Sequence, residues 1–191
     1  MRAMPEFTRA VPDGDTRERL VCAQCGHVDY QNPKIIVGSV VVHDGRVLLC
    51  RRAIEPRRGF WTLPAGYLEL GETAEEGAAR EALEEAGARI VFEGLLAIYS
   101  ISRIGQVQLI FRAGFADPAA PALAAGPESE AVGLFAWQDI PWADLAFPSV
   151  RWALTAWQAG HGAPLGAPAS NPTDDPRGQR RIGRELSVGG L

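Results

Sequence analysis

The segment from Thr73 to Gly87 contains a complete helix signal, and it limits the folds open to this chain. Thr73 and Glu76 have the spacing of a capping box, in which each side chain satisfies the other's free backbone amide, so a helix is expected to begin at about Ala74. Gly87 suits the left-handed conformation that ends helices. One face of this helix carries apolar side chains, mostly small ones, at Ala78, Ala79, Ala82, Leu83 and Ala86. Alanines let a helix approach a sheet closely, so a layered fold is expected.

Strand signals lie on both sides of this helix. Ile35–His43 and Arg46–Arg52 are joined by Asp44-Gly45, a dipeptide typical of two-residue hairpin turns, in which both central residues need positive φ. A second, amphipathic helix is expected over Ser149–Gln158, after Pro148, and a helical turn over Asp139–Leu145. The further expected strands are Tyr67–Leu70, Arg89–Ser102, Gln106–Ala116 and Glu130–Trp137. Because strands and helices do not alternate strictly, this order favours an α/β fold with a mixed sheet.

Composition divides the chain into three zones. Residues 1–33 are polar and rich in Pro and Gly, and they are expected to form an irregular lead-in. Residues 34–160 have dense, periodic apolar residues and the length of a common domain. Residues 161–191 are rich in Gly, Pro and polar residues, so we expect a mobile tail that lies on the domain or on a partner subunit.

Charge and hydropathy exclude several classes of function. The longest apolar run, Ile35–Val42, is far short of the roughly 20 residues needed to cross a bilayer. The first 20 residues lack the apolar core of a secretory signal, so a cytoplasmic location is expected and the three cysteines are interpreted as thiols. With 19 basic and 23 acidic residues, the net charge of −4 gives no general attraction to nucleic acid or to a membrane surface.

The expected helix also carries an acidic face. Glu81, Glu84 and Glu85 fall within an arc of roughly 100°. Like charges three and four residues apart repel by about 0.2 to 0.5 kcal/mol per pair, so three on one face require an explanation. One explanation is a solvated surface. The other is a hard divalent cation, Mg²⁺ or Mn²⁺, which prefers oxygen ligands and is commonly shared with substrate phosphates.

The spacing of the charged and glycine residues around this helix resembles the Nudix box. The matching positions are Gly66, Glu72, Arg80, Glu81, Glu84, Glu85 and Gly87. The resemblance covers most of residues 34–160. It implies an α/β/α sandwich with a mixed sheet and a hydrolase that cleaves a nucleoside diphosphate linked to another group.

The resemblance also implies roles for the residues of the box. Glu81, Glu84 and Glu85 would bind the metal together with the backbone carbonyl of Ala65, and Arg80 would pair with Glu72 to brace the loop against the helix. The general base would be Glu81 or an acid from a later loop. The acids available in that loop are Glu128 and Glu130, and the alternative is that both are exposed loop residues.

Basic and aromatic residues between the hairpin and the box offer contacts for a substrate. Arginines suit phosphates, and aromatic rings suit stacking on a base. The candidates are Arg51, Arg52, Phe60, Trp61 and Tyr67. Side chains alternate along a strand, so only one of Arg51 and Arg52 is expected to face the site. Trp61 has a second interpretation as a core residue, and Arg57 and Arg58 have one as surface ion-pair partners.

Cys22-Ala-Gln-Cys25 resembles the second half of the zinc ribbon that precedes the box in some Nudix hydrolases. A structural zinc ion needs four ligands, and residues 1–21 contain neither Cys nor His, so bound zinc is not expected. Cys50 lies in an apolar strand and is expected to be buried.

The stretches Leu48–Pro56, Trp61–Tyr67 and Gly126–Ser129 resemble the Nudix subgroup that hydrolyses FAD and ADP-ribose. The sequence thus predicts a magnesium-dependent pyrophosphatase acting on a small nucleotide, with no nucleic-acid partner, and the resemblance implies a homodimer. The alternatives are a nucleoside triphosphate pyrophosphohydrolase and a non-catalytic regulator that senses a nucleotide.

Overall fold

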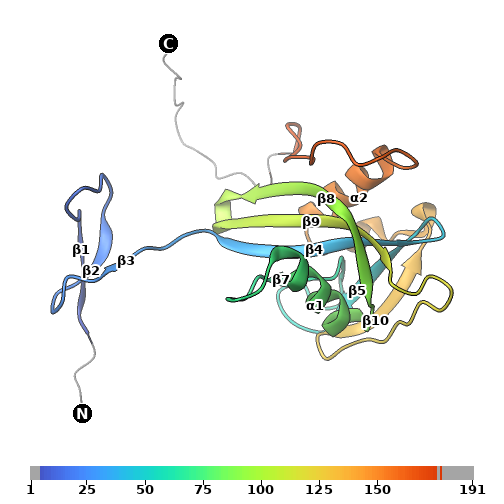
Figure 1. The fold of residues 1–191 in the computed structure, drawn as a ribbon, viewed down its shortest axis with the longest axis horizontal. Coiled ribbons are helices and arrows are strands. Elements are labelled where there is room, and N and C mark those ends of the chain that lie inside the picture. Colours follow the sequence, from blue (N-terminus) through green and yellow to red (C-terminus); the bar gives the residue numbers. More distant parts are fainter. Residues whose placement is uncertain (1–4, 176, 178–191) are drawn as a thin grey trace, which may run out of the picture. The chain divides into compact units, whose positions relative to one another are not determined.

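A mixed sheet forms the centre of the larger of two units in this chain (Figure 1). The computed structural model describes residues 5–175 and residue 177, and it divides the chain into Met1–Pro33 and Lys34–Leu191. In the second unit the strand order is β10-β5-β4-β9-β8, with β6 beside β5 and β7 beside β4. The strands are β4 (Lys34–His43), β5 (Arg46–Arg52), β6 (Trp61–Thr62), β7 (Ala65–Tyr67), β8 (Ile90–Ile101), β9 (Gln106–Phe115) and β10 (Ser129–Phe135). Because β4 and β9 are parallel and the other pairs antiparallel, the expected mixed sheet is confirmed.

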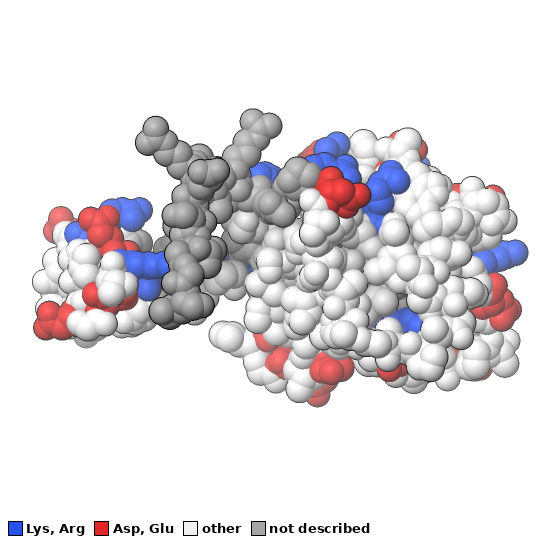
Figure 2. Space-filling model, turned by 90° about the horizontal axis from the view of Figure 1, so that it is seen from above, with Lys and Arg blue, Asp and Glu red and all other residues white. Residues whose placement is uncertain are grey.

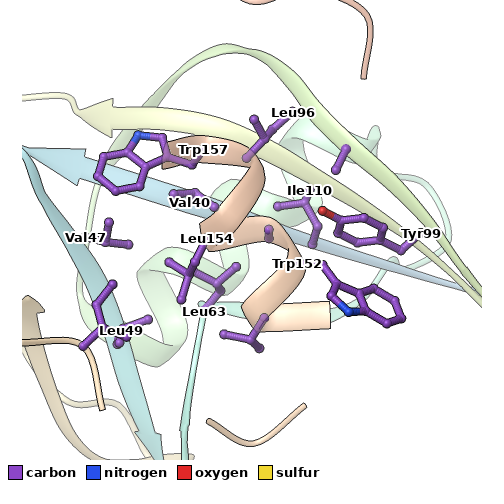
Figure 3. Packing of buried hydrophobic residues seen from close by; sticks show 14 of the residues in the cluster. Val40, Val47, Leu49, Leu63, Leu96, Tyr99, Ile110, Trp152, Leu154 and Trp157 are labelled. Atoms are coloured by element: carbon purple, nitrogen blue, oxygen red, sulfur yellow. The ribbon is translucent and has the colours of Figure 1, made fainter. Parts of the chain in front are cut away.

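Two helices cover opposite faces of this sheet, as Figure 1 shows for α1 (Ala74–Ala86, green) and α2 (Pro148–Ala159, orange). Alternate residues of β4 point to opposite sides, so Val41 packs in one cluster with Ala86 of α1 while Val40 packs in another with Leu154 of α2. Figure 3 shows the second cluster, in which Trp152, Leu154 and Trp157 of α2 meet residues of the strands. The expected α/β/α sandwich is therefore confirmed.

The local signals of the sequence are present in the structure. Asp44 and Gly45 have φ angles of 47° and 70° between β4 and β5, as the hairpin turn requires. The Glu76 amide donates to Thr73 Oγ1 at 3.2 Å, and the Thr73 amide donates to Glu76 Oε2 at 2.8 Å, which completes the capping box. Gly87 ends α1 with a φ of 64°. These contacts fix both ends of the helix that carries the acidic residues.

Other boundaries differ from the expectation. The strand expected over Tyr67–Leu70 lies earlier, because β7 pairs Ala65–Tyr67 with the middle of β4 and ends at Tyr67. Two short turns of 3₁₀-helix, η2 (Trp137–Asp139) and η3 (Trp142–Asp144), lie in and just before the expected helical turn over 139–145. A third, η1 (Ser102–Ile104), precedes the turn between β8 and β9. Among the described helices, none is long and apolar enough to cross a membrane.

The first unit is a small antiparallel sheet, where the sequence predicted an irregular segment. Its strands are β1 (Phe7–Ala10), β2 (Arg19–Cys22) and β3 (Val28–Asp29), in that order. The prediction was wrong because most side chains of these short strands are exposed or half-buried, so no alternation of apolar and polar residues marks them.

Part of the expected tail is bound to the edge of the sheet. The main chain of Ala169 accepts a hydrogen bond from the Ile98 amide at 2.8 Å and donates one to the Leu96 carbonyl at 2.9 Å. The Asn171 side chain bonds both to the amide and to the carbonyl of Ser100. Backbone pairing along an edge strand is not visible in a Pro/Gly-rich composition. The rest of the expected tail, residue 176 and residues 178–191, lies outside the described residues.

Candidate active site

The loop of β7 approaches α1 and β4 closely because two glycines make room for it. A Cβ atom at Gly38 of β4 would lie 2.5 Å from the Cβ of Ala65. A Cβ atom at Gly66 would lie 2.3 Å from Oε1 of Glu81. Glycine at these positions therefore lets the loop lie on the sheet and lets the Glu81 carboxylate lie against the loop.

Glu85 is the most buried carboxylate of the acidic face, with 6% of its surface exposed. Its Oε2 accepts a hydrogen bond from the Ala65 amide at 3.0 Å. Burial raises the pKa of Glu85 to about 7, and the charges of Glu81 and Glu128 act in the same direction, while the Ala65 amide and Arg52 oppose them. Burial also raises the pKa of Glu81. Both carboxylates are thus held where a cation would stabilise their charge.

Arg80 connects the loop to the acidic face, and all five of its N–H donors have partners. Its Nε and Nη2 donate to the two oxygens of Glu72 at 3.0 and 2.9 Å, which is a bidentate pair, and Nη2 also donates to the Tyr67 carbonyl at 3.0 Å. Its Nη1 donates to Glu81 Oε1 at 2.7 Å and to Glu84 Oε2 at 3.1 Å. These contacts hold the pKa of Glu72 near 2, with the Arg80 hydrogen bonds as the main cause.

The expected brace between Arg80 and Glu72 is therefore present, and Arg80 has a further role that the sequence did not suggest. The same guanidinium fixes the orientation of Glu81 and Glu84.

The donor set of α1 fits a hard divalent cation. Glu81, Glu84 and Glu85 each use one carboxylate oxygen in the contacts above, and the second oxygen of each accepts no hydrogen bond from the described residues. Oxygen donors of this kind suit Mg²⁺ or Mn²⁺. Within residues 5–175 and 177, no three Asp, Glu, His or Cys side chains are gathered as a preformed metal site. The ligand set, including the carbonyl of Ala65, stays a prediction.

The loop before β10 separates the two acids that the sequence left as alternatives. A Cβ atom at Gly126 would lie 1.7 Å from the Glu84 carbonyl oxygen, so this loop touches the backbone of α1. Glu128 follows, and its charge acts on both Glu81 and Glu85. A register shift between Ser129 and Ala131 lies at Glu130, whose carboxylate pairs instead with Arg58 at 3.1 Å. The structure therefore associates Glu128 with the acidic face and Glu130 with the arginines.

The arginines at the end of β5 have different partners. Arg51 Nε donates to the Gly59 carbonyl at 2.9 Å and lies 3.7 Å from Oε2 of Glu130. Arg52 Nε donates to the Pro56 carbonyl at 2.8 Å, and its charge lowers the pKa of Glu85. Of the two, Arg52 is the one whose charge is among the main influences on Glu85. Which of them faces the site stays a prediction.

The aromatic candidates divide between the surface and the core. Trp61 is half-buried and packs edge-on against Phe135 with ring centroids 4.8 Å apart, which favours its interpretation as a core residue. Phe60 lies under the guanidinium of Arg57, 5.2 Å from the ring centroid. Tyr67 remains 47% exposed, with the Lys34 ammonium 5.0 Å from its ring centroid.

Two neighbours of these groups were not identified from the sequence. They are Lys34 beside Tyr67 and Phe147 under Arg52. No short motif marks them, since each meets its partner from a distant segment. Figure 2 shows one face of the molecule, on which Lys and Arg side chains of the described residues lie among acidic and uncharged ones.

Fold and site together define an α/β/α sandwich with an acidic loop and helix on one face of the sheet. The family model for the NUDIX domain matches residues 33–158, and a second one, described as Nudix N-terminal, matches residues 5–31. The crystal structure of a NUDIX hydrolase from Nitrosomonas europaea is 44% identical, with a TM-score of 0.80 over 87% of this chain and 94% of that chain. The chain belongs to the NUDIX family.

Curated relatives match over shorter stretches. A MutT-like protein of Streptomyces ambofaciens is 47% identical over 77 residues, which are 40% of this chain and 48% of that protein. The ADP-ribose pyrophosphatase of Methanocaldococcus jannaschii is 38% identical over 71 residues, 37% of this chain and 42% of that protein. The chain thus spans less than half the length of either relative.

Proposed function

We propose that this protein is an Mg²⁺- or Mn²⁺-dependent hydrolase that cleaves the pyrophosphate bond of a nucleoside diphosphate linked to a second group, with FAD or ADP-ribose as substrate. The observation that carries the proposal is the meeting of two kinds of side chain at one place. The charge of Glu128 acts on Glu81 and Glu85 of α1, and Ser129, the next residue, pairs in register with Arg52 at the end of β5. Carboxylates for a metal ion and an arginine for a phosphate are thus adjacent.

The residues of this chain would share the work as follows. Glu81, Glu84 and Glu85 would hold a divalent cation, which would supply Lewis-acid activation of a phosphoryl oxygen and of a water molecule. The Ala65 amide fixes Glu85, and the Nη1 group of Arg80 fixes Glu81 and Glu84, so the ligands are oriented before substrate binds. Glu128 orients the attacking water and accepts its proton, with Glu81 as the second candidate for that role.

Substrate recognition would use the other side of the site. Arg52 would contact a phosphate, and Arg51, whose Nε lies 3.7 Å from Oε2 of Glu130, is the second candidate for that contact. Tyr67 and Phe60 offer exposed or half-buried rings on which adenine or flavin can stack, an interaction worth about 1 to 3 kcal/mol per base. The ADP-ribose pyrophosphatase among the relatives supports this class of substrate.

A turnover screen tests the proposal. FAD, ADP-ribose, NADH and nucleoside triphosphates are incubated with the protein and Mg²⁺, and products are separated by chromatography. FAD or ADP-ribose should show the highest kcat/KM and yield AMP together with FMN or ribose 5-phosphate. Preferential release of pyrophosphate from a triphosphate would make the protein a triphosphate pyrophosphohydrolase. Tight binding of a nucleotide without turnover would make it a nucleotide-sensing regulator.

We further propose that the enzyme works as a cytoplasmic homodimer on a small molecule rather than on nucleic acid. The net charge of −4 supports the last point, because it gives no general attraction to a polyanion. Light scattering coupled to size-exclusion chromatography tests the oligomeric state, and a monomer at assay concentrations would contradict the dimer.

A further inference from the structure

Cys22 and Cys25 of the first unit belong to a single closed turn. The Cys22 amide donates to the His27 carbonyl at 2.8 Å, and the Gly26 amide donates to the Cys22 carbonyl at 2.9 Å. Gly26 closes the turn with a φ of 71°. The two cysteines of this turn differ strongly in exposure: Cys22 is only 4% exposed, whereas Cys25 lies at the surface.

The surroundings of the Cys22 sulfur favour its ionised form. The amides of Gln24 and Cys25 stabilise the Cys22 thiolate, the Cys25 thiol contributes a hydrogen bond, and together they hold the pKa of Cys22 below its ordinary value. The third cysteine provides a contrast within the same chain. Burial in β5 raises the pKa of Cys50, so that thiol is held in its unreactive form.

The pair also occupies a position that matters for its unit. Among the described residues of the first unit, Cys22 is the one buried apolar side chain. Units of about 40 residues or fewer seldom bury enough apolar surface to be stable without a covalent or metal crosslink. A disulfide bond at Cys22 would therefore crosslink the unit at its most buried side chain.

We propose that Cys22 and Cys25 form a redox-active dithiol, which low-molecular-weight disulfides such as oxidised glutathione convert into an intramolecular disulfide. This inference is independent of the proposed hydrolase function, since it concerns neither its residues nor its substrate.

The reaction follows thiol–disulfide exchange. The exposed Cys25 thiol first loses its proton to solvent. Its Sγ then attacks one sulfur of the reagent, forms a mixed disulfide and releases the first thiolate. The neighbouring Cys22 thiolate then attacks Cys25 Sγ, forms the Cys22–Cys25 bond and releases the second. The two protein thiols are oxidised by two electrons, and the reagent disulfide is reduced to two thiols, which take up the two protons.

The test uses the full chain with its metal content measured in the same sample. After incubation with oxidised glutathione, the intact mass should fall by two hydrogens, and peptide mapping should locate the bond between Cys22 and Cys25. Reduced glutathione in excess should restore both thiols. The control Cys50→Ala should behave as the unchanged chain does.

Two variants separate the steps. Cys22→Ser should stop at a stable glutathione adduct on Cys25, because no second thiol resolves it. Cys25→Ser should form almost no adduct, because its remaining thiol in the turn is buried. A glutathione adduct that persists in the unchanged chain, thiols that stay unreacted, or a bound zinc ion that shields both cysteines until a chelator removes it would each overturn the proposal.

Discussion

At the scale of single residues, the candidate site is a set of carboxylates that repel one another and are held in place by few donors. Burying the charge of Glu85 is costly, and one backbone amide and the charge of Arg52 are the contacts that offset the cost. Arg80 carries a single positive charge for Glu72, Glu81 and Glu84 together. Negative charge therefore remains in excess at this place, which is the electrostatic condition that favours a divalent cation.

The first prediction concerns the two glutamates expected to bind the metal. Glu84→Gln and Glu85→Gln should each lower kcat/KM about 100-fold or more, the scale of losing one electrostatic contact in a reacting site. Neither change should lower the melting temperature, because each removes a repelling charge and keeps the shape of the side chain. Rates at saturating Mg²⁺ and thermal melts measure the two effects.

The control is Glu75→Gln, which changes an exposed acid in the first turn of α1 and should leave the rate unchanged. Near-normal rates in both site variants would contradict the metal assignment.

The second prediction follows from the pKa of Glu85. Because burial raises that pKa from an ordinary value of 4.5 to about 7, the folded chain binds this proton more tightly than the unfolded chain. The resulting stability is fully present below pH 4.5 and is lost as the pH rises through 7, with a size on the order of 3 kcal/mol. Thermal melts in the presence of a chelator should therefore show a decline over this range that is smaller in Glu85→Gln. Equal slopes in the two proteins would show that folding does not raise the pKa of Glu85.

At the scale of elements, the parts of the fold set by neighbouring residues were predictable. The capping box of Thr73 and Glu76, the terminating Gly87 and the turn at Asp44 depend on local backbone geometry, so the sequence contains their whole cause. The acidic face of α1 follows from the helix period in the same way. The three glutamates expected to bind the metal could be grouped from the sequence because they lie on this one element, whereas Ala65, the other expected ligand, lies in β7.

Features that depend on a distant partner were not predictable from the sequence. Glu128 and Glu130 are two residues apart, and the sequence gives no reason to assign them different partners. Their partners differ in the structure because of the register shift in β10. The pairing of Ala169 with β8 needs the edge of a finished sheet. The contact of Trp61 with Phe135 likewise depends on a residue from another strand.

The third prediction tests how the loop before β10 is seated on α1. In Gly126→Ala the new methyl group would overlap the Glu84 carbonyl, so the loop must move away from the helix and carry Glu128 with it. We expect a loss of about 1 to 3 kcal/mol in the free energy of unfolding, typical of overpacking, together with a lower kcat. Gly166→Ala is the matched control, because nothing lies within 4 Å of a Cβ atom there. Chemical denaturation and steady-state rates measure both variants, and equal behaviour would show that the loop does not depend on this contact.

At the scale of the whole molecule, the residues of the candidate site come from one unit. The acids of α1, the loop of β7, the end of β5 and the loop before β10 all follow Lys34 in the chain. The first unit instead contains the pair of cysteines and a sheet of its own. The candidate site thus lies in the second unit, and the pair Cys22 and Cys25 lies in the first.

The last prediction separates these two contributions. A chain that begins at Pro33 keeps the bond from the Lys34 amide to the Gly105 carbonyl, 2.9 Å long, and all contacts described for the candidate site. We expect it to fold, to bind Mn²⁺ as the full chain does and to retain kcat/KM within a few-fold. Full-length Cys22→Ser is the control for a change in the first unit that leaves the chain length intact. Circular dichroism, Mn²⁺ titration and steady-state kinetics make the comparison. A shortened chain that folds and binds Mn²⁺ but loses more than about tenfold in kcat/KM, equivalent to about 1.4 kcal/mol of transition-state stabilisation, would place part of the substrate site in the first unit.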